Sequence, residues 1–173
     1  MEPHASIPQL GIFVIQALFH WGAMGVSALA IFLIGFLWYY LLFKGPRMKL
    51  AGVNLEESKG FSIGGFVFAL LSAIALSFMI TLFSALVDFI YLVSQGPDFL
   101  IEQAPSTVRF FLLSVGVVGF STLLYFVLGM FYSFMKKPAL VALIDTGYLF
   151  LVLLVAASIH SFWPLVLNVQ DFL

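Results

Sequence analysis

The 173-residue chain contains no cysteine and has few charged residues. The absence of cysteine excludes disulfides, thiolate metal sites and cysteine nucleophiles together. Only 9% of the residues are charged, whereas about a quarter are charged in typical soluble domains. The formal net charge of −1 gives no indication of a nucleic-acid partner. No Lys or Arg precedes the first apolar run, so we expect no cleavable signal peptide and a mature chain that begins at Met1.

Recognisable catalytic motifs are also missing. The chain contains no HExxH pair, no glycine-rich phosphate loop and no G-x-S-x-G elbow. The sequence therefore predicts neither an enzyme nor a bound cofactor.

Apolar residues dominate what is present. They make up 63% of the chain, and the mean hydropathy is +1.16. Four stretches, 20–43, 61–88, 108–134 and 138–163, each hold at least the ~20 residues that a helix needs to cross a hydrocarbon core. We predict an all-α membrane protein with one domain, an antiparallel four-helix transmembrane bundle. Residues 7–19 are expected to form an interfacial helix that breaks near Gly22–Gly25, or an outward extension of the first helix.

The distribution of Lys and Arg predicts the orientation, because short cytoplasmic loops collect positive charge. Only Arg109 lies among the outer segments. Both termini are therefore expected outside a plasma or inner membrane, with membrane lipids as partners. Trp38, Tyr39, Tyr40 and Lys44 are expected to anchor the inner interface, and Trp21 and Trp163 the outer one. The basic residues of the two loops on the inner side are Lys44, Arg47, Lys49, Lys59, Lys136 and Lys137.

Small residues recur along the second and third apolar stretches. In a membrane such rows allow helix backbones to approach closely. The row in 61–88 predicts that this helix is the packing spine of the bundle, and a second row in 108–134 predicts that helix's close-packing face. The rows are Gly65, Ala69, Ala73, Ser77, Thr81 and Ala85, then Gly116, Gly119 and Thr122.

Several of these residues occur in an order that resembles a known membrane protein family. They are Gly35, Trp38, Tyr39, Leu42, Phe43, Met48, Lys49 and Gly52, then Gly119-Phe120, Pro138, the run Leu143 to Tyr148, and Trp163. The pattern resembles the small four-helix membrane proteins catalogued as domain of unknown function 1761, over roughly residues 21–163. Arg47 replaces a usual aromatic and Leu149 a frequent His. The resemblance implies a four-helix membrane fold and no activity.

Asp145 is the main candidate for chemistry. A carboxylate in an apolar helix is costly if it faces lipid, so it should face the bundle or a wet cavity. Tyr148 lies three residues further on the same helix face and could share a hydrogen bond or a proton with it. One interpretation is a proton or cation site near the inner mouth. The other is a structural carboxylate that pairs with Lys44, Lys136 or a Trp or Tyr donor.

His20, Asp88 and His160 form a candidate outer polar cluster. They are expected at similar depth, where two His and an Asp could bind a metal or two His could ligate a haem iron. The alternative is that His20 and His160 extend their polar tips to water at the ends of helices.

Three functions remain open from the sequence. The first is a non-catalytic accessory subunit or scaffold in a homo-oligomeric or larger membrane assembly. The second is an oligomeric small transporter or channel that uses Asp145 and Tyr148. The third is a metal- or haem-binding redox protein that uses His20 and His160.

Overall fold

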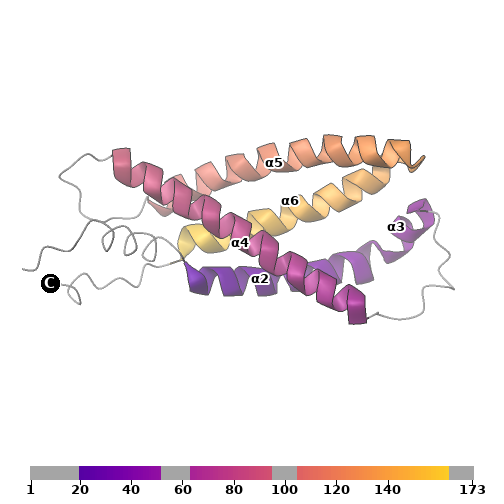
Figure 1. The fold of residues 1–173 in the computed structure, drawn as a ribbon, viewed down its shortest axis with the longest axis horizontal. Coiled ribbons are helices and arrows are strands. Elements are labelled where there is room, and N and C mark those ends of the chain that lie inside the picture. Colours follow the sequence, from indigo (N-terminus) through magenta and orange to yellow (C-terminus); the bar gives the residue numbers. More distant parts are fainter. Residues whose placement is uncertain (1–19, 52–62, 95–104, 164–173) are drawn as a thin grey trace, which may run out of the picture.

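A computed structural model describes residues 20–51, 63–94 and 105–163, and these segments are helical apart from short ends and turns (Figure 1). The proposed N-terminal helix, 7–19, lies outside the described residues. The elements are α2 (Trp21–Phe36), the π-helical segment η1 (Leu37–Leu42), α3 (Lys44–Ala51), α4 (Ile63–Ser94), α5 (Ser106–Phe134) and α6 (Ala139–Phe162).

Four of the helical stretches are long and apolar enough to cross a membrane. They are Trp21–Leu42, which joins α2 and η1, Ile63–Tyr91, Ser106–Phe134 and Ala139–Phe162. Each exceeds the ~20 residues that a bilayer core requires. The described chain is therefore all-helical and fits a small integral membrane protein.

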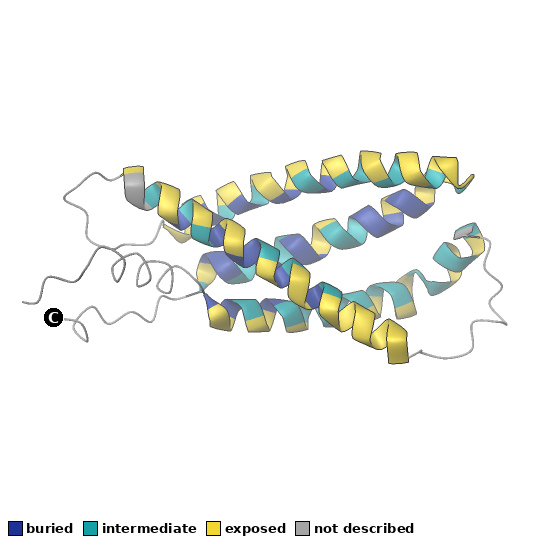
Figure 2. Cartoon of the chain, viewed as in Figure 1, coloured by how far each residue is buried: buried dark blue, intermediate teal, exposed yellow. Residues whose placement is uncertain are grey.

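The packing centre of the bundle is α6, and the prediction that the second apolar stretch forms the spine is wrong. Of the four candidate spans, α6 has the largest buried share, and it packs against α2, α4 and α5. Figure 2 shows long buried stretches on α6, whereas α4 and α5 carry extensive exposed surface. The buried core includes Ile31, Ala73, Val117, Val152 and Ala156.

The small residues of α4 serve different neighbours along its length. Ala73, Ser77 and Thr81 are buried, but Gly65 and Ala69, nearer the start of the helix, are exposed. After Thr81 the buried positions move to Ser84 and Asp88. This drift arises because a four-residue spacing does not match the ~3.6 residues of a helical turn.

The small residues of α5 do not face the bundle, contrary to the sequence prediction. Gly116, Gly119 and Thr122 are exposed, and a Cβ at either glycine would meet nothing within 4 Å. The helix instead buries residues at intervals of four, Arg109, Leu113, Val117 and Ser121. Val117 and Leu113 supply the apolar contacts on that face.

The first spanning helix continues into structure that the sequence analysis treated as a loop. In η1 the amide of Phe43 donates to the carbonyl oxygen of Trp38 at 2.8 Å, five residues back, which is the π-helical pattern. The helix α3 then begins at Lys44. Pro46 lies in the first turn of α3, where its missing N–H costs nothing, so it starts a helix here.

The turn between α5 and α6 is closed by a Schellman motif. Lys137 N donates to Tyr132 O at 2.8 Å, and Lys136 N donates to Ser133 O at 2.9 Å. Lys136 takes the left-handed conformation that this motif needs, with φ of 56°. The motif fixes the last turn of α5, which carries Tyr132, against the start of α6.

Candidate functional site

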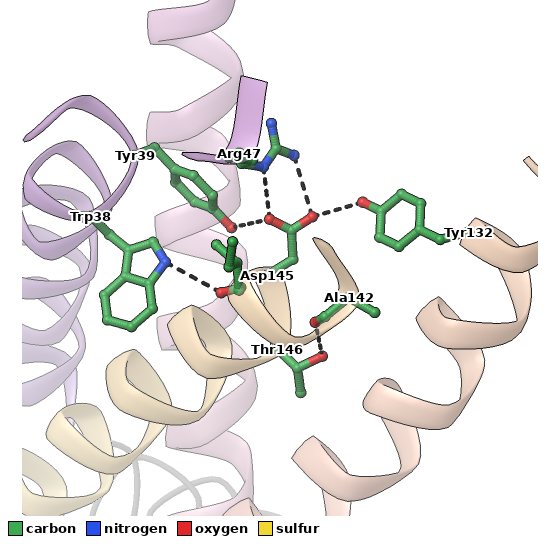
Figure 3. A network of polar contacts seen from close by, with 8 residues as sticks. Trp38, Tyr39, Arg47, Tyr132, Ala142, Asp145 and Thr146 are labelled. Carbon is green, nitrogen blue, oxygen red and sulfur yellow. Dashed lines mark hydrogen bonds and ion pairs between the residues drawn. The ribbon is translucent and has the colours of Figure 1, made fainter. Parts of the chain in front are cut away.

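Asp145 lies at the centre of a network of polar side chains at the Lys44 end of the bundle (Figure 3). Arg47 makes a bidentate contact, with Nε 2.8 Å from Oδ1 and Nη2 3.3 Å from Oδ2. The hydroxyl of Tyr39 donates to Oδ1 at 3.1 Å, and that of Tyr132 donates to Oδ2 at 2.7 Å. Both carboxylate oxygens therefore have two donors each.

These partners reach Asp145 from three other elements. Tyr39 comes from η1, Arg47 from α3 and Tyr132 from the last turn of α5. The Asp145 side chain is 10% exposed and that of Arg47 is 38% exposed, so the pair lies at the edge of the bundle. The hydrogen bonds to Asp145 raise the pKa of Arg47 above its ordinary value and keep the guanidinium charged.

The cation that pairs with Asp145 differs from the two lysines that the sequence suggested, whereas the third kind of expected partner, a Tyr donor, is present as Tyr39 and Tyr132. Lys44 and Lys136 were the expected cations, whereas the partner is Arg47. The Lys44 ammonium instead lies 4.8 Å from the ring centroid of Tyr40. The sequence analysis placed Arg47 in a loop. In the structure Arg47 lies in the helix α3, which positions its side chain beside the Asp145 carboxylate.

Tyr148 contacts the first spanning helix. The Tyr148 hydroxyl donates to Ile31 O of α2 at 3.4 Å, in place of the hydrogen bond to Asp145 that the sequence suggested. The ring lies 5.0 Å from that of Tyr39, centroid to centroid. Trp38, one of the predicted interface anchors, donates from Nε1 to Ile144 O at 3.2 Å.

A second polar cluster lies at the opposite end of the bundle and includes the residues expected there. The His20 Nε2 atom is 3.8 Å from Asp88 Oδ2. Arg109 Nε is 3.3 Å from Asp88 Oδ1. Asp88 and Arg109 are each 1% exposed. The structure therefore adds Arg109 to this cluster, a residue that the sequence analysis used only to predict orientation.

His160 of α6 contacts residues of α2, α4 and α5 and joins the cluster through Arg109. Its Nε2 atom is 2.8 Å from Thr81 Oγ1, and its Nδ1 atom is 2.9 Å from Ala156 O and 3.3 Å from Ser27 Oγ. Its carbonyl oxygen accepts from Arg109 Nη2 at 2.7 Å. His160 is 0% exposed, so its ring does not reach water at the helix end.

Arg109 supplies a positive charge beside Asp88, because an arginine side chain stays protonated in proteins.

In both clusters, ion pairs and hydrogen bonds connect several helices of the bundle. Each places an Asp against an Arg from another helix, and each ties together at least three elements. Among the described residues, 20–51, 63–94 and 105–163, no group of three or more His, Cys, Asp or Glu could hold a metal ion. No protein-family model, curated protein or solved structure matches this chain.

Proposed function

We propose that this protein is a non-catalytic subunit or scaffold of a membrane protein assembly, built as an antiparallel four-helix bundle of the cell membrane with both termini outside. The observation that carries this proposal is the pairing of Asp88 and Asp145 with Arg109 and Arg47. A carboxylate that serves a transported proton or cation must bind and release it. A carboxylate that is already neutralised by an arginine serves better to hold helices in place.

The outward face of α5 supports an assembly role. Gly116 and Gly119 are one turn apart on a helix, and both are open to the exterior of the bundle. In lipid, exposed small residues allow a second helix to approach closely, and close packing is a main source of helix association there. The family resemblance, which implies the same four-helix fold without an activity, is compatible with this role and stays a prediction.

The alternatives are less well supported by the geometry. A transporter that uses Asp145 and Tyr148 would need a labile carboxylate, yet Asp145 accepts hydrogen bonds from Arg47, Tyr39 and Tyr132. A redox site on His20 and His160 would need two free ring nitrogens aimed at one iron. The His160 ring nitrogens instead face Thr81, Ser27 and Ala156.

The test is the native mass of the protein, extracted in mild detergent from its own membrane. We expect a defined complex that contains more than one chain. Because the protein has no cysteine, a single Gly119→Cys substitution gives a unique crosslinking position, and Ser121→Cys on the buried face of α5 is the matched control. Crosslinking at residue 119 but not at 121 supports an interface on α5. A lone chain in the native mass measurement, with no crosslink at either position, would refute the proposal.

A further inference from the structure

A cavity of about 540 Å³ opens between the first half of α4 and the continuous segment α2, η1 and α3. This volume falls within the range of ligand pockets, roughly 300–1,000 Å³. Tyr148 of α6 also lines it. The cavity is separate from the buried Asp88 cluster and touches the Asp145 network only through Tyr39 and Arg47.

One half of the cavity is apolar. Phe32 and Phe36 line it from α2, and Phe68 lines it from α4 beside Ala69. Phe36 and Phe68 are 42% and 74% exposed, so this wall is open toward the surrounding lipid. Gly65 and Ala69 have little or no side chain, and this leaves space on the α4 side. The apolar half therefore suits a hydrocarbon chain.

The other half is polar and positively charged. Lys44 and Arg47 line it together with Tyr39 and Tyr40. Arg47 uses Nε and Nη2 to hold Asp145, and its second terminal nitrogen points away from that carboxylate (Figure 3). Two cations, Lys44 and Arg47, stand against the single carboxylate Asp145, which leaves a local charge of +1 among the described residues.

The two halves adjoin along the consecutive elements α2 and η1. The rings of Phe36 and Tyr40 are stacked with centroids 5.0 Å apart, so an aromatic wall leads from the apolar half to Lys44. A ligand that fills this groove needs an anionic head and a long apolar tail in that order.

We propose that this groove is a binding site for one anionic phospholipid of the leaflet on the Lys44 side. The phosphate lies against the Lys44 ammonium and the free side of the Arg47 guanidinium, and one acyl chain lies along Phe32, Phe36 and Phe68. Trp38, Tyr39 and Tyr40 are of the type that marks the headgroup level. An anionic lipid in a basic, interfacial site is attracted by roughly 1 kcal/mol per cation. This inference is independent of the assembly role proposed above.

The test is native mass spectrometry of the full chain in micelles that contain equal amounts of phosphatidylglycerol and phosphatidylcholine. We expect the wild-type chain to retain one phosphatidylglycerol in preference to phosphatidylcholine. Lys44→Gln should weaken retention about fivefold, the size expected for the loss of one cation near an anionic head. Lys49→Gln is the matched control, because Lys49 lies on the same helix α3, is exposed and does not line the cavity.

A second pair of variants tests the apolar half. Ala69→Phe fills the groove and should abolish the retained lipid, whereas Ala75→Phe makes the same change at an exposed position of α4 outside the cavity. Glycerol phosphate, which has the head without the tail, should not compete. Equal loss of lipid in Lys44→Gln and Lys49→Gln would reduce the effect to diffuse attraction and overturn the proposal. Undiminished binding in Ala69→Phe, or full competition by glycerol phosphate, would also overturn it.

Discussion

Asp145 shows how a costly residue becomes acceptable in an apolar helix. An unpaired carboxylate in this position would lose the hydration that water provides. Here a bidentate arginine and two tyrosine hydroxyls replace that hydration. Arg47 is more than a third exposed, so part of its charge remains solvated and the pair avoids the full desolvation penalty of a deeply buried one. The network therefore joins four elements at modest cost.

Removal of one tyrosine hydroxyl from this network should measure its contribution. Tyr132→Phe deletes the shortest hydrogen bond to Asp145, 2.7 Å long, and leaves the ring in place. Hydrogen bonds to charged groups contribute about 1.5 kcal/mol or more, and we expect the free energy of unfolding to fall by about that amount. Unfolding by sodium dodecyl sulfate in mixed micelles, followed by helical circular dichroism, gives this value.

The matched control is Tyr125→Phe, on the same helix but away from Asp145. It should change the unfolding free energy by a few tenths of a kcal/mol at most. An equal loss in the two variants would show that the Tyr132 hydroxyl has no special role in the network.

The importance of Asp145 could be predicted from the sequence, but its main partner could not. The cost of a carboxylate in an apolar stretch singles out Asp145 without any structure. Arg47 lies almost a hundred residues earlier, in a stretch with Gly45 and Pro46 that reads as a loop. Its selection over Lys44 depends on the direction of α3, which single-sequence periodicity does not determine. The same reason explains why Arg109 was missed as the partner of Asp88.

The π-helical segment η1 carries two of the side chains that contact α6. A π-helical turn holds one more residue than an α-helical turn between bonded groups, so it shifts the facing of the residues after it. Trp38 and Tyr39, both in η1, contact the same turn of α6, at Ile144 O and at the Asp145 carboxylate. The change of facing also sets the start of α3 and the position of Arg47. Hydropathy alone shows only a continuous apolar helix here.

Close approach of α2 and α6 depends on Gly35. A Cβ at this position would lie 2.8 Å from the Tyr148 hydroxyl oxygen. We expect Gly35→Ala to lower the unfolding free energy by about 1–3 kcal/mol, because overpacking forces side chains or backbone to shift. Thermal unfolding in detergent measures the change, and the double variant Gly35→Ala with Tyr148→Phe should recover part of it.

Gly25→Ala is the control on the same helix, since its Cβ would meet nothing within 4 Å. It should be neutral or stabilising, because alanine favours a helix by about 1 kcal/mol over glycine. Destabilisation of equal size at both positions would contradict the role assigned to the contact between Gly35 and Tyr148.

The sequence predicts where spanning helices occur better than it predicts which face each one buries. Apolar composition extends around the whole circumference of these helices, since lipid and bundle interior both accept Leu, Val and Phe. Small residues were the other signal for the buried face of each helix. They predicted burial correctly for Ala73 and Ser77, but Gly116 and Gly119 are exposed. A small residue permits close contact in the membrane without specifying whether the contact lies inside the chain or with another one.

The two ionic clusters lie toward opposite ends of the bundle with an apolar layer between them. Ile31, Val117 and Val152 belong to that layer. The Asp145 cluster adjoins the described basic residues Lys44 and Lys49, whereas the Asp88 cluster contains the single arginine assigned to the outer side. If the orientation predicted from the basic loops holds, the Asp145 network and the proposed lipid groove lie on the cytoplasmic side.

Two matched serines at the ends of α5 test this orientation. Ser106 and Ser133 are both exposed, and about 40 Å of helix separates them at ~1.5 Å per residue, more than the hydrocarbon core is thick. The chain has no cysteine, so Ser106→Cys and Ser133→Cys each introduce a unique thiol. In intact cells a membrane-impermeant maleimide should label residue 106 and reach residue 133 only after permeabilisation. The reverse pattern would invert the protein, moving the groove lined by Lys44 to the outer leaflet, and labelling of both in intact cells would show that α5 does not span the membrane.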